Sequence, residues 1–144
     1  MVNGTIVKFG YPAAVVAETD DWVVLLRPQA VTLGSLVLAA KSEATAFGAL
    51  PPKSFAGLSQ ATAGIEAALA TFVRYEKINY LMLMMVDPHV HFHVIPRYQG
   101  SRSYNGVDYA DVGWPGMPAL SSSQALDAAT TASIVAALRD CGLT

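Results

Sequence analysis

The chain begins with three short apolar runs that predict β-strands. Residues 13–19 (AAVVAET) and 22–28 (WVVLLRP) lie on either side of Asp20-Asp21, which are predicted to form a turn. Residues 34–41 (GSLVLAAK) start at a glycine and stay apolar, which is typical of a buried strand. We therefore expect three strands in the first third of the chain.

After Pro51-Pro52 the apolar positions change to a helical spacing. Between Phe55 and Phe72 they recur at intervals of 3, 4, 3, 4 and 3 residues. This pattern predicts a helix of about five to six turns that packs one face on the sheet. The expected buried stripe consists of Phe55, Leu58, Thr62, Ile65, Leu69 and Phe72.

Two further β-rich runs follow the predicted helix. Residues 80–86 (YLMLMMV) and 89–96 (HVHFHVIP) are separated only by Asp87-Pro88. A link this short between two strands favours adjacent antiparallel pairing.

The C-terminal third begins with a long segment that shows no periodicity. Residues 99–120 are rich in Gly, Tyr and Pro, and their aromatic content favours a loop that faces a substrate. Residues 121–124 (SSSQ) have a capping-box pattern, which predicts the start of a second helix. The apolar positions of that helix are Leu126, Thr130, Ile134 and Leu138, and Gly142 is expected to end it.

Together these elements predict a single α+β domain over residues 1–144. It would contain an antiparallel sheet of about five strands, one long central helix and a C-terminal helix. We expect the core to span about residues 13–97, with loop 99–120 and helix 121–141 as a C-terminal extension.

Composition limits the possible partners and the location. The chain is 53% hydrophobic and 14% charged with a net charge of −2, which argues against nucleic-acid binding and agrees with a second subunit covering part of the surface. The apolar run 80–86 is too short for a membrane span, and the N-terminus lacks a signal-peptide pattern. With Cys141 as the single cysteine, these features predict a cytoplasmic protein.

All three histidines of the chain lie in one strand-like segment, at positions 89, 91 and 93. Alternate residues of a strand share one face at a spacing of ~6.6 Å, so the three rings would project together. Like charges this close lower one another's pKa, and a neutral imidazole is a competent nucleophile. Three interpretations are open: a metal site, a set of buried structural histidines, or phosphoryl or nucleotidyl transfer through the middle ring.

Residues 89–95 (HVHFHVI) resemble the signature of the histidine triad (HIT) superfamily, in which histidines alternate with hydrophobic residues. Pro96-Arg97 continues as in many members, and residues 27–41 resemble the family's strand that carries a glycine and an aliphatic run. The resemblance covers about residues 15–97 and implies a HIT-like fold.

The resemblance also implies a function. Family members are nucleotide hydrolases or nucleotidyltransferases that cleave at the α-phosphate of purine nucleotide conjugates, such as dinucleoside polyphosphates or nucleoside phosphoramidates. His91 would be the catalytic nucleophile that forms a covalent nucleotidyl intermediate, His93 would hydrogen-bond the phosphate, and His89 would support the nucleophile. The family further implies a homodimer and no cofactor, with Mg²⁺ at most accompanying a polyphosphate substrate.

The sequence departs from the family pattern around the phosphate. Ser35 stands where many relatives have a histidine, and Asp87-Pro88 replaces a glycine-rich phosphate loop. Phosphate contacts must then come from other residues, so we count Ser35 and Arg97 among the expected substrate-binding residues, with Arg102 as an alternative cation.

Two more positions bear on substrate recognition. Arg27 lies near the place where many relatives carry an acidic residue that binds the ribose hydroxyls, so ribose recognition would differ if Arg27 faces the pocket. Trp114-Pro115-Gly116 resembles a Trp-Pro segment that reaches the partner subunit's active site, which adds Trp114 to the expected substrate-binding residues.

Two alternatives to an enzyme stay open at this point. The missing glycine-rich loop favours a nucleotide-binding regulatory module with weak catalysis. A metal-binding protein that uses the three histidines is the other, although the outer two would lie ~13 Å apart at the backbone.

Overall fold

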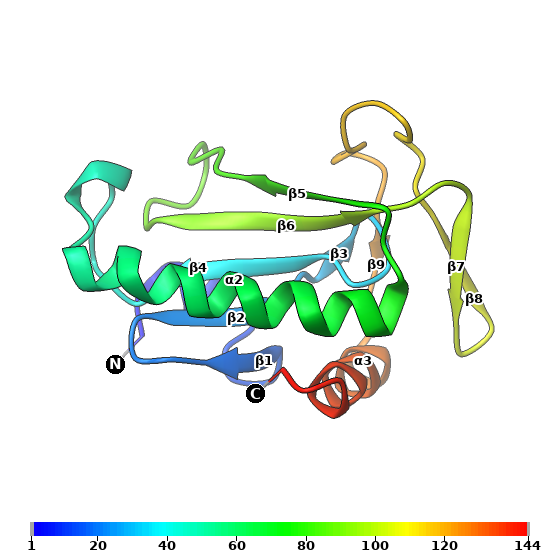
Figure 1. Ribbon diagram of the computed structural model, residues 1–144, viewed down its shortest axis with the longest axis horizontal. Helices are drawn as coiled ribbons and strands as arrows, with labels where there is room; N and C mark the ends of the chain where they lie inside the picture. The colour runs from blue at the N-terminus through cyan, green and yellow to red at the C-terminus, as the bar shows by residue number, and fades with distance from the viewer. Residues whose placement is uncertain (1, 144) are drawn as a thin grey trace.

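A computed structural model describes residues 2–143 of the protein. Its centre is a five-stranded antiparallel sheet with strand order β1-β2-β4-β6-β5, which confirms the predicted α+β architecture (Figure 1). The strands are β1 (Val15–Glu18), β2 (Trp22–Leu26), β4 (Leu36–Ala40), β5 (Lys77–Leu81) and β6 (His91–Arg97).

The other elements surround this sheet. Two small antiparallel ladders join β3 (Gln29–Ala30) to β9 (Gln124–Ala125) and β7 (Ser101–Tyr104) to β8 (Val107–Ala110). The helical segments are α1 (Gly4–Lys8), the short 3-10 helix Phe47–Ala49, α2 (Pro52–Val73) and α3 (Ala128–Asp140). Among residues 2–143, none of the helices combines the length and the apolar composition that a membrane crossing requires.

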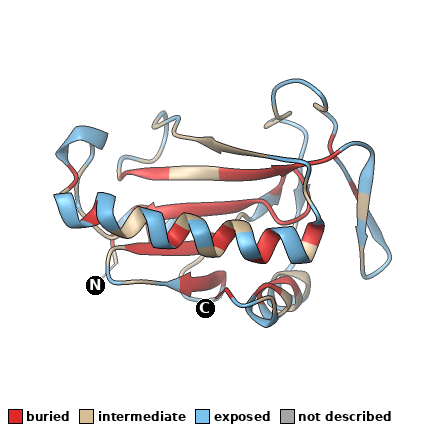
Figure 2. Ribbon diagram, viewed as in Figure 1, coloured by how far each residue is buried: buried red, intermediate tan, exposed pale blue. Residues whose placement is uncertain are grey.

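Helix α2 covers one face of the sheet, as its periodicity predicts (Figure 1). Ile65 and Leu69 are fully buried against the inward residues of the central strands, which are buried along much of their length (Figure 2). Phe55 departs from the predicted stripe because it remains 40% exposed and packs on Phe47 instead, with ring centroids 5.4 Å apart. The helix therefore supplies scaffold and leaves the opposite face of the sheet for the histidines.

The opposite face carries a second, smaller apolar cluster. Val37 and Ala39 of β4 pair with His93 and His91 of β6, so these four side chains lie on the same face. Ile6 of α1 is fully buried in the cluster that contains Val37 and Ala39. The N-terminal segment thus covers this face up to the edge of the histidines.

The predicted strand over residues 80–86 is wrong in its position. β5 pairs Lys77 with Arg97 and Leu81 with His93, and the strand ends there. Residues 82–86 instead form the connection to β6, where Met85 is 85% and Val86 80% exposed. The apolar composition of the run does not show which of its residues form hydrogen bonds with β6. The register between the two strands determines this. The predicted antiparallel adjacency of the two strands is confirmed.

The predicted start of the C-terminal helix is also wrong. Gln124 pairs with Ala30 in the β3-β9 ladder, so the segment with the capping-box pattern includes a short strand. α3 begins after Asp127, whose Oδ1 accepts a hydrogen bond from the amide of Thr130 at 2.7 Å. Helix α3 ends at Asp140, and Gly142 follows with φ of 99°. The loop predicted over residues 99–120 contains the β7-β8 hairpin.

Candidate functional site

His91 and His93 lie on the same face of β6, as strand alternation predicts. Their ring centroids are 5.2 Å apart in an edge-to-face arrangement. His89 lies two residues before the strand begins, so its ring is placed by other contacts. The structure therefore places the rings of His91 and His93 side by side, while His89 contacts His91 through its backbone carbonyl.

The ring of His91 is held in one orientation by the backbone. Its Nδ1 atom lies 2.7 Å from the carbonyl oxygen of His89, and since a carbonyl only accepts, Nδ1 carries the proton. Nε2 of the neutral ring is then unprotonated and keeps its lone pair. Although His91 is only 2% exposed, it lines a pocket. Among residues 2–143, every side-chain nitrogen or oxygen that is fully buried has a hydrogen-bond partner. Nε2 of His91 has no such partner, so this atom must lie on the part of the ring that solvent can reach.

His93 contacts a guanidinium. The Nε atom of Arg27 donates a hydrogen bond to Nδ1 of His93 at 3.3 Å. Burial, then the positive charge of Arg27 and then the coulombic effect of His91 together lower the pKa of His93 to about 4, against the opposing effect of Asp87. His93 is therefore neutral near pH 7, with its proton on Nε2.

His89 is held by α1 and by a carboxylate. Its Nε2 lies 3.0 Å from a carboxylate oxygen of Glu43, and its Nδ1 lies 2.9 Å from the hydroxyl of Thr5. The backbone amide of His89 also donates to this hydroxyl at 3.3 Å. These contacts hold the backbone of residue 89, whose carbonyl faces Nδ1 of His91.

His91 and His93 line a pocket of about 270 Å³, and His89 is not among its lining residues. Phe9 packs its ring against both His91 and His93, with centroid distances of 5.6 and 6.0 Å. Lys8 forms an ion pair with Asp87 at 2.6 Å across the pocket wall. The walls are completed by Arg27 and by the exposed apolar residues of the segment 83–86. Two cations and one carboxylate give the pocket an excess of positive charge when the histidines are neutral.

An apolar pocket of about 280 Å³ lies next to this site and shares Phe9 with it. Leu26 and Pro28, which flank Arg27 in the chain, line it on one side. Leu126 and residues of α3 line the other side. The triad pocket is therefore polar and positively charged, whereas its neighbour is apolar.

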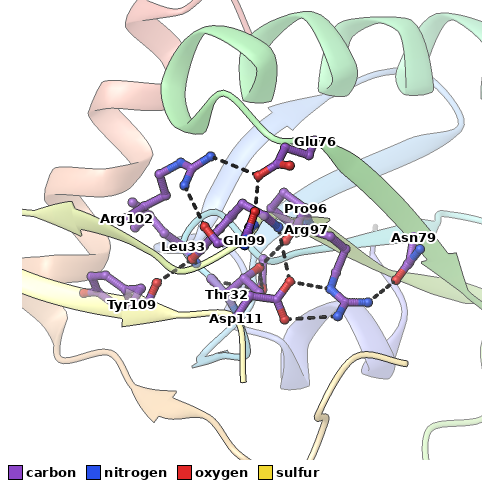
Figure 3. Close-up of polar contacts among 12 residues, drawn as sticks. Thr32, Leu33, Glu76, Asn79, Pro96, Arg97, Gln99, Arg102, Tyr109 and Asp111 are labelled. Carbon is purple, nitrogen blue, oxygen red and sulfur yellow. Dashed lines mark hydrogen bonds and ion pairs between the residues drawn. The ribbon is translucent and has the colours of Figure 1, made fainter. Parts of the chain in front are cut away.

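The structure does not bring Arg97 to the triad pocket. Its guanidinium binds Asp111 through Nε at 2.7 Å and Nη2 at 3.1 Å, while Nη1 donates to Asn79 at 2.8 Å (Figure 3). The side chains of Arg97 and Asp111 are 4% and 1% exposed. The expected phosphate contact is thus replaced by a buried ion pair, because the predicted loop supplies a carboxylate that the local sequence pattern does not reveal.

Three other expected residues also lie outside the triad pocket. Ser35 is buried, and its hydroxyl donates to the carbonyl of Thr32 at 2.9 Å. Arg102 donates a hydrogen bond to the carbonyl of Val73 at 2.9 Å, so it caps the C-terminus of α2. Trp114 lines a larger cavity of about 630 Å³ along the edge strand β5.

The contacts of the histidines also bear on the metal alternative. Nδ1 of His91 faces a carbonyl and Nδ1 of His93 faces a guanidinium, which leaves few ring nitrogens free to converge. Across residues 2–143, no group of three or more His, Cys, Asp or Glu side chains is placed to hold a metal ion.

Several residues of the site were not predicted from the sequence. Lys8, Phe9 and Thr5 come from the N-terminal segment, and Glu43 follows β4. No spacing rule connects these positions with residue 91, because their contacts span between 46 and 84 residues of chain. Arg27 was noted only because it lies near the position where many relatives carry an acidic residue that binds the ribose, and its bond to His93 was not predicted.

Comparison with known proteins agrees with the geometry. The family model of the HIT domain matches residues 8–100. A histidine triad protein from Sinorhizobium meliloti has 19% identity and a TM-score of 0.75, covering 97% of this chain and 95% of its own. One from Bradyrhizobium japonicum has 20% identity and a TM-score of 0.69, covering 97% and 96%.

A zinc-bound histidine triad family protein from Mycobacterium smegmatis has 18% identity and a TM-score of 0.57, covering 94% of this chain and 93% of its own. At these identities the solved structures show a shared fold. No curated protein matches the chain.

Proposed function

Because the chain belongs to the HIT family, we propose that it is a nucleotide hydrolase or nucleotidyltransferase that acts through His91. Its substrate would be a purine nucleotide conjugate, such as a dinucleoside polyphosphate or a nucleoside phosphoramidate, cleaved at the α-phosphate. The observation that carries this proposal is the 2.7 Å contact between Nδ1 of His91 and the carbonyl of His89. This contact leaves the lone pair of Nε2 available for attack at phosphorus.

The proposed reaction has two displacements at one phosphorus. In the first, Nε2 of His91 forms a P–N bond while the bond from phosphorus to the leaving group breaks, and the leaving group takes the electron pair. In the second, water or another acceptor forms a new bond to phosphorus and loses a proton. The P–N bond breaks, its electron pair returns to Nε2, and a nucleoside monophosphate or a new conjugate departs.

The two neighbouring pockets suggest how a nucleotide conjugate would lie. The phosphate would occupy the triad pocket, where Nε2–H of His93 and the charge of Lys8 favour an anion. The nucleoside would extend past Phe9 toward the apolar pocket that shares this ring. No cofactor is required by this chemistry, and Mg²⁺ would enter only with a polyphosphate substrate.

We further propose a homodimer in the cytoplasm. β5 is an edge strand of the sheet, so one of its sides offers backbone groups that a second copy could pair with. The cavity beside β5 contains Trp114, which would then lie near the second subunit. Sedimentation at micromolar concentration is expected to give twice the mass of the chain, and a monomer would contradict the assembly. A free Cys141 agrees with a reducing location.

A second candidate is a nucleotide-binding regulatory module with weak catalysis. The low exposure of His91 favours it, because only a small part of the ring is open to a substrate phosphate. Tight binding of AMP with no turnover above buffer would support this candidate over the enzyme.

The experiment measures AMP release from labelled diadenosine polyphosphates and adenosine phosphoramidates. Wild-type protein should release AMP and form an acid-labile adenylate on His91 that mass spectrometry locates. His91→Asn should abolish both, since the amide retains a donor near the carbonyl of His89 but has no nucleophilic nitrogen. Lys53→Ala is the matched control, because Lys53 is a surface residue outside both pockets. AMP release that persists in His91→Asn would eliminate the proposed role.

A further inference from the structure

We infer that Arg27 is a positioning residue that holds His93 in the Nε2–H tautomer, so that this ring donates to a substrate phosphate oxygen. The inference rests on the proposed function for the identity of the acceptor. The arrangement of Arg27 and His93 itself is a property of the folded protein.

The chemistry of the two groups decides the tautomer. A guanidinium has N–H donors and no acceptor, so its Nε–H requires a lone pair on Nδ1 of His93 at 3.3 Å. The proton of the neutral imidazole must then lie on Nε2. A protonated His93 would place a second N–H against that of Arg27, and the geometry therefore also disfavours the imidazolium form.

Arg27 is itself held by its surroundings. Its Nη1 atom donates to the carbonyl of Gln29, and its backbone amide donates to the carbonyl of Ser35 at 3.0 Å. Gln29 in turn pairs with Ala125 in the β3-β9 ladder. Segments from three parts of the chain thus fix the guanidinium next to β6, so that little ordering remains when substrate binds.

The other groups around His93 do not replace Arg27. Phe9 and Leu81 are apolar neighbours, from the N-terminal segment and from β5. The ionisable groups that share the pocket with His93 are Lys8, Arg27, Asp87 and His91. Asp87 favours protonation of His93 but is paired with Lys8 at 2.6 Å, while Arg27 and His91 disfavour it. Of these groups, Arg27 is the one that hydrogen-bonds to Nδ1 of His93.

The test compares three forms of the 144-residue chain by ¹⁵N NMR of the histidine rings. In wild-type protein, His93 should be an Nε2–H tautomer that stays neutral well below pH 6. Arg27→Met removes the donor and the charge, so His93 should become a mixture of tautomers and titrate closer to its ordinary pKa of about 6.5. Arg27→Lys keeps the charge without the planar donor, so it should retain the low titration point and lose part of the tautomer preference.

Kinetics provide the second readout. With the substrate that wild-type protein turns over, Arg27→Met should lower kcat by about 10- to 100-fold at pH 6, with a smaller change in KM. A tautomer and titration of His93 that are unchanged in Arg27→Met would overturn the inference, whatever the activity. If wild-type protein has no turnover while its His93 still depends on Arg27, the proposed function fails and the positioning of His93 by Arg27 is supported.

Discussion

Nδ1 of His91 lies 2.7 Å from the carbonyl oxygen of His89, two residues earlier in the chain. In a β-strand the carbonyl groups point toward the neighbouring strands, whereas the side chains stand above and below the sheet. A side chain therefore rarely reaches the carbonyl two residues before it. Here the bond forms because β6 begins only at His91 and residue 89 is anchored to Thr5. In the proposed mechanism, the first histidine would thus support His91 through its backbone carbonyl, while the contacts of its ring hold that backbone in place.

This relationship predicts different results for two histidine variants. His91→Asn should lower turnover by about 10⁴-fold or more, because the nucleophile is lost. His89→Ala should reduce kcat by about 10- to 100-fold, since the carbonyl remains but the ring contacts to Thr5 and Glu43 are lost and the bond from the residue 89 amide to Thr5 is left to hold it. Steady-state kinetics on both variants would check this, and equal losses for the two would contradict the division of roles.

The low pKa of His93 predicts a pH-dependent stability. The folded pKa is about 4, below the ordinary value of 6.5, so the unfolded chain binds more protons between these values. The contribution of His93 is therefore fully present above about pH 6.5 and is lost as the pH falls toward 4. Urea unfolding at pH 7, 5.5 and 4.5 should show a steeper decline for wild type than for His93→Asn. Parallel declines would refute the prediction.

The buried pair of Arg97 and Asp111 should contribute to stability in a way that a surface pair does not. Asp111→Ala leaves a buried guanidinium with only Asn79 as a side-chain partner, and should cost about 3–5 kcal/mol in the free energy of unfolding. Lys53→Ala removes an ion pair at 3.6 Å between an exposed lysine and the largely covered Asp21, and should cost at most about 1 kcal/mol. Chemical denaturation measures both.

A double variant tests the cause. Replacing Arg97 and Asp111 together by leucine should destabilise the protein less than Asp111→Ala alone, since no buried charge then lacks a partner. A double variant that is less stable than Asp111→Ala would show that the pair acts by more than mutual neutralisation.

Gly34 should tolerate no side chain. It has φ of 86°, and an added Cβ would lie 3.0 Å from Cδ2 of Leu69, which is fully buried. Gly34→Ala should cost about 1–3 kcal/mol through backbone strain and overpacking. Gly100→Ala measures the cost of backbone strain alone, because Gly100 has φ of 77° but open space around it. Gly48→Ala serves as the control without a positive φ and without a close contact. Equal unfolding midpoints for all three variants would contradict this account.

Periodic patterns predicted the central elements well because burial on one face repeats along a regular element. The intervals between Phe55 and Phe72 correspond to α2, and the alternation of His91 and His93 with hydrophobic residues corresponds to β6. The run over 80–86 failed because an apolar composition is compatible with a strand or with an exposed connection. Partner strands, which lie far away in the chain, decide between the two.

The spacing of the histidines, the long helix and the pairing of two successive strands followed from local sequence, since each depends on residues only a few positions apart. The partners of the site did not. Arg27 reaches His93 across 66 residues, and Asp111 takes Arg97 out of reach of the phosphate site. Such contacts depend on where whole segments pack, so only the folded arrangement decides which of several arginines lies beside the histidines.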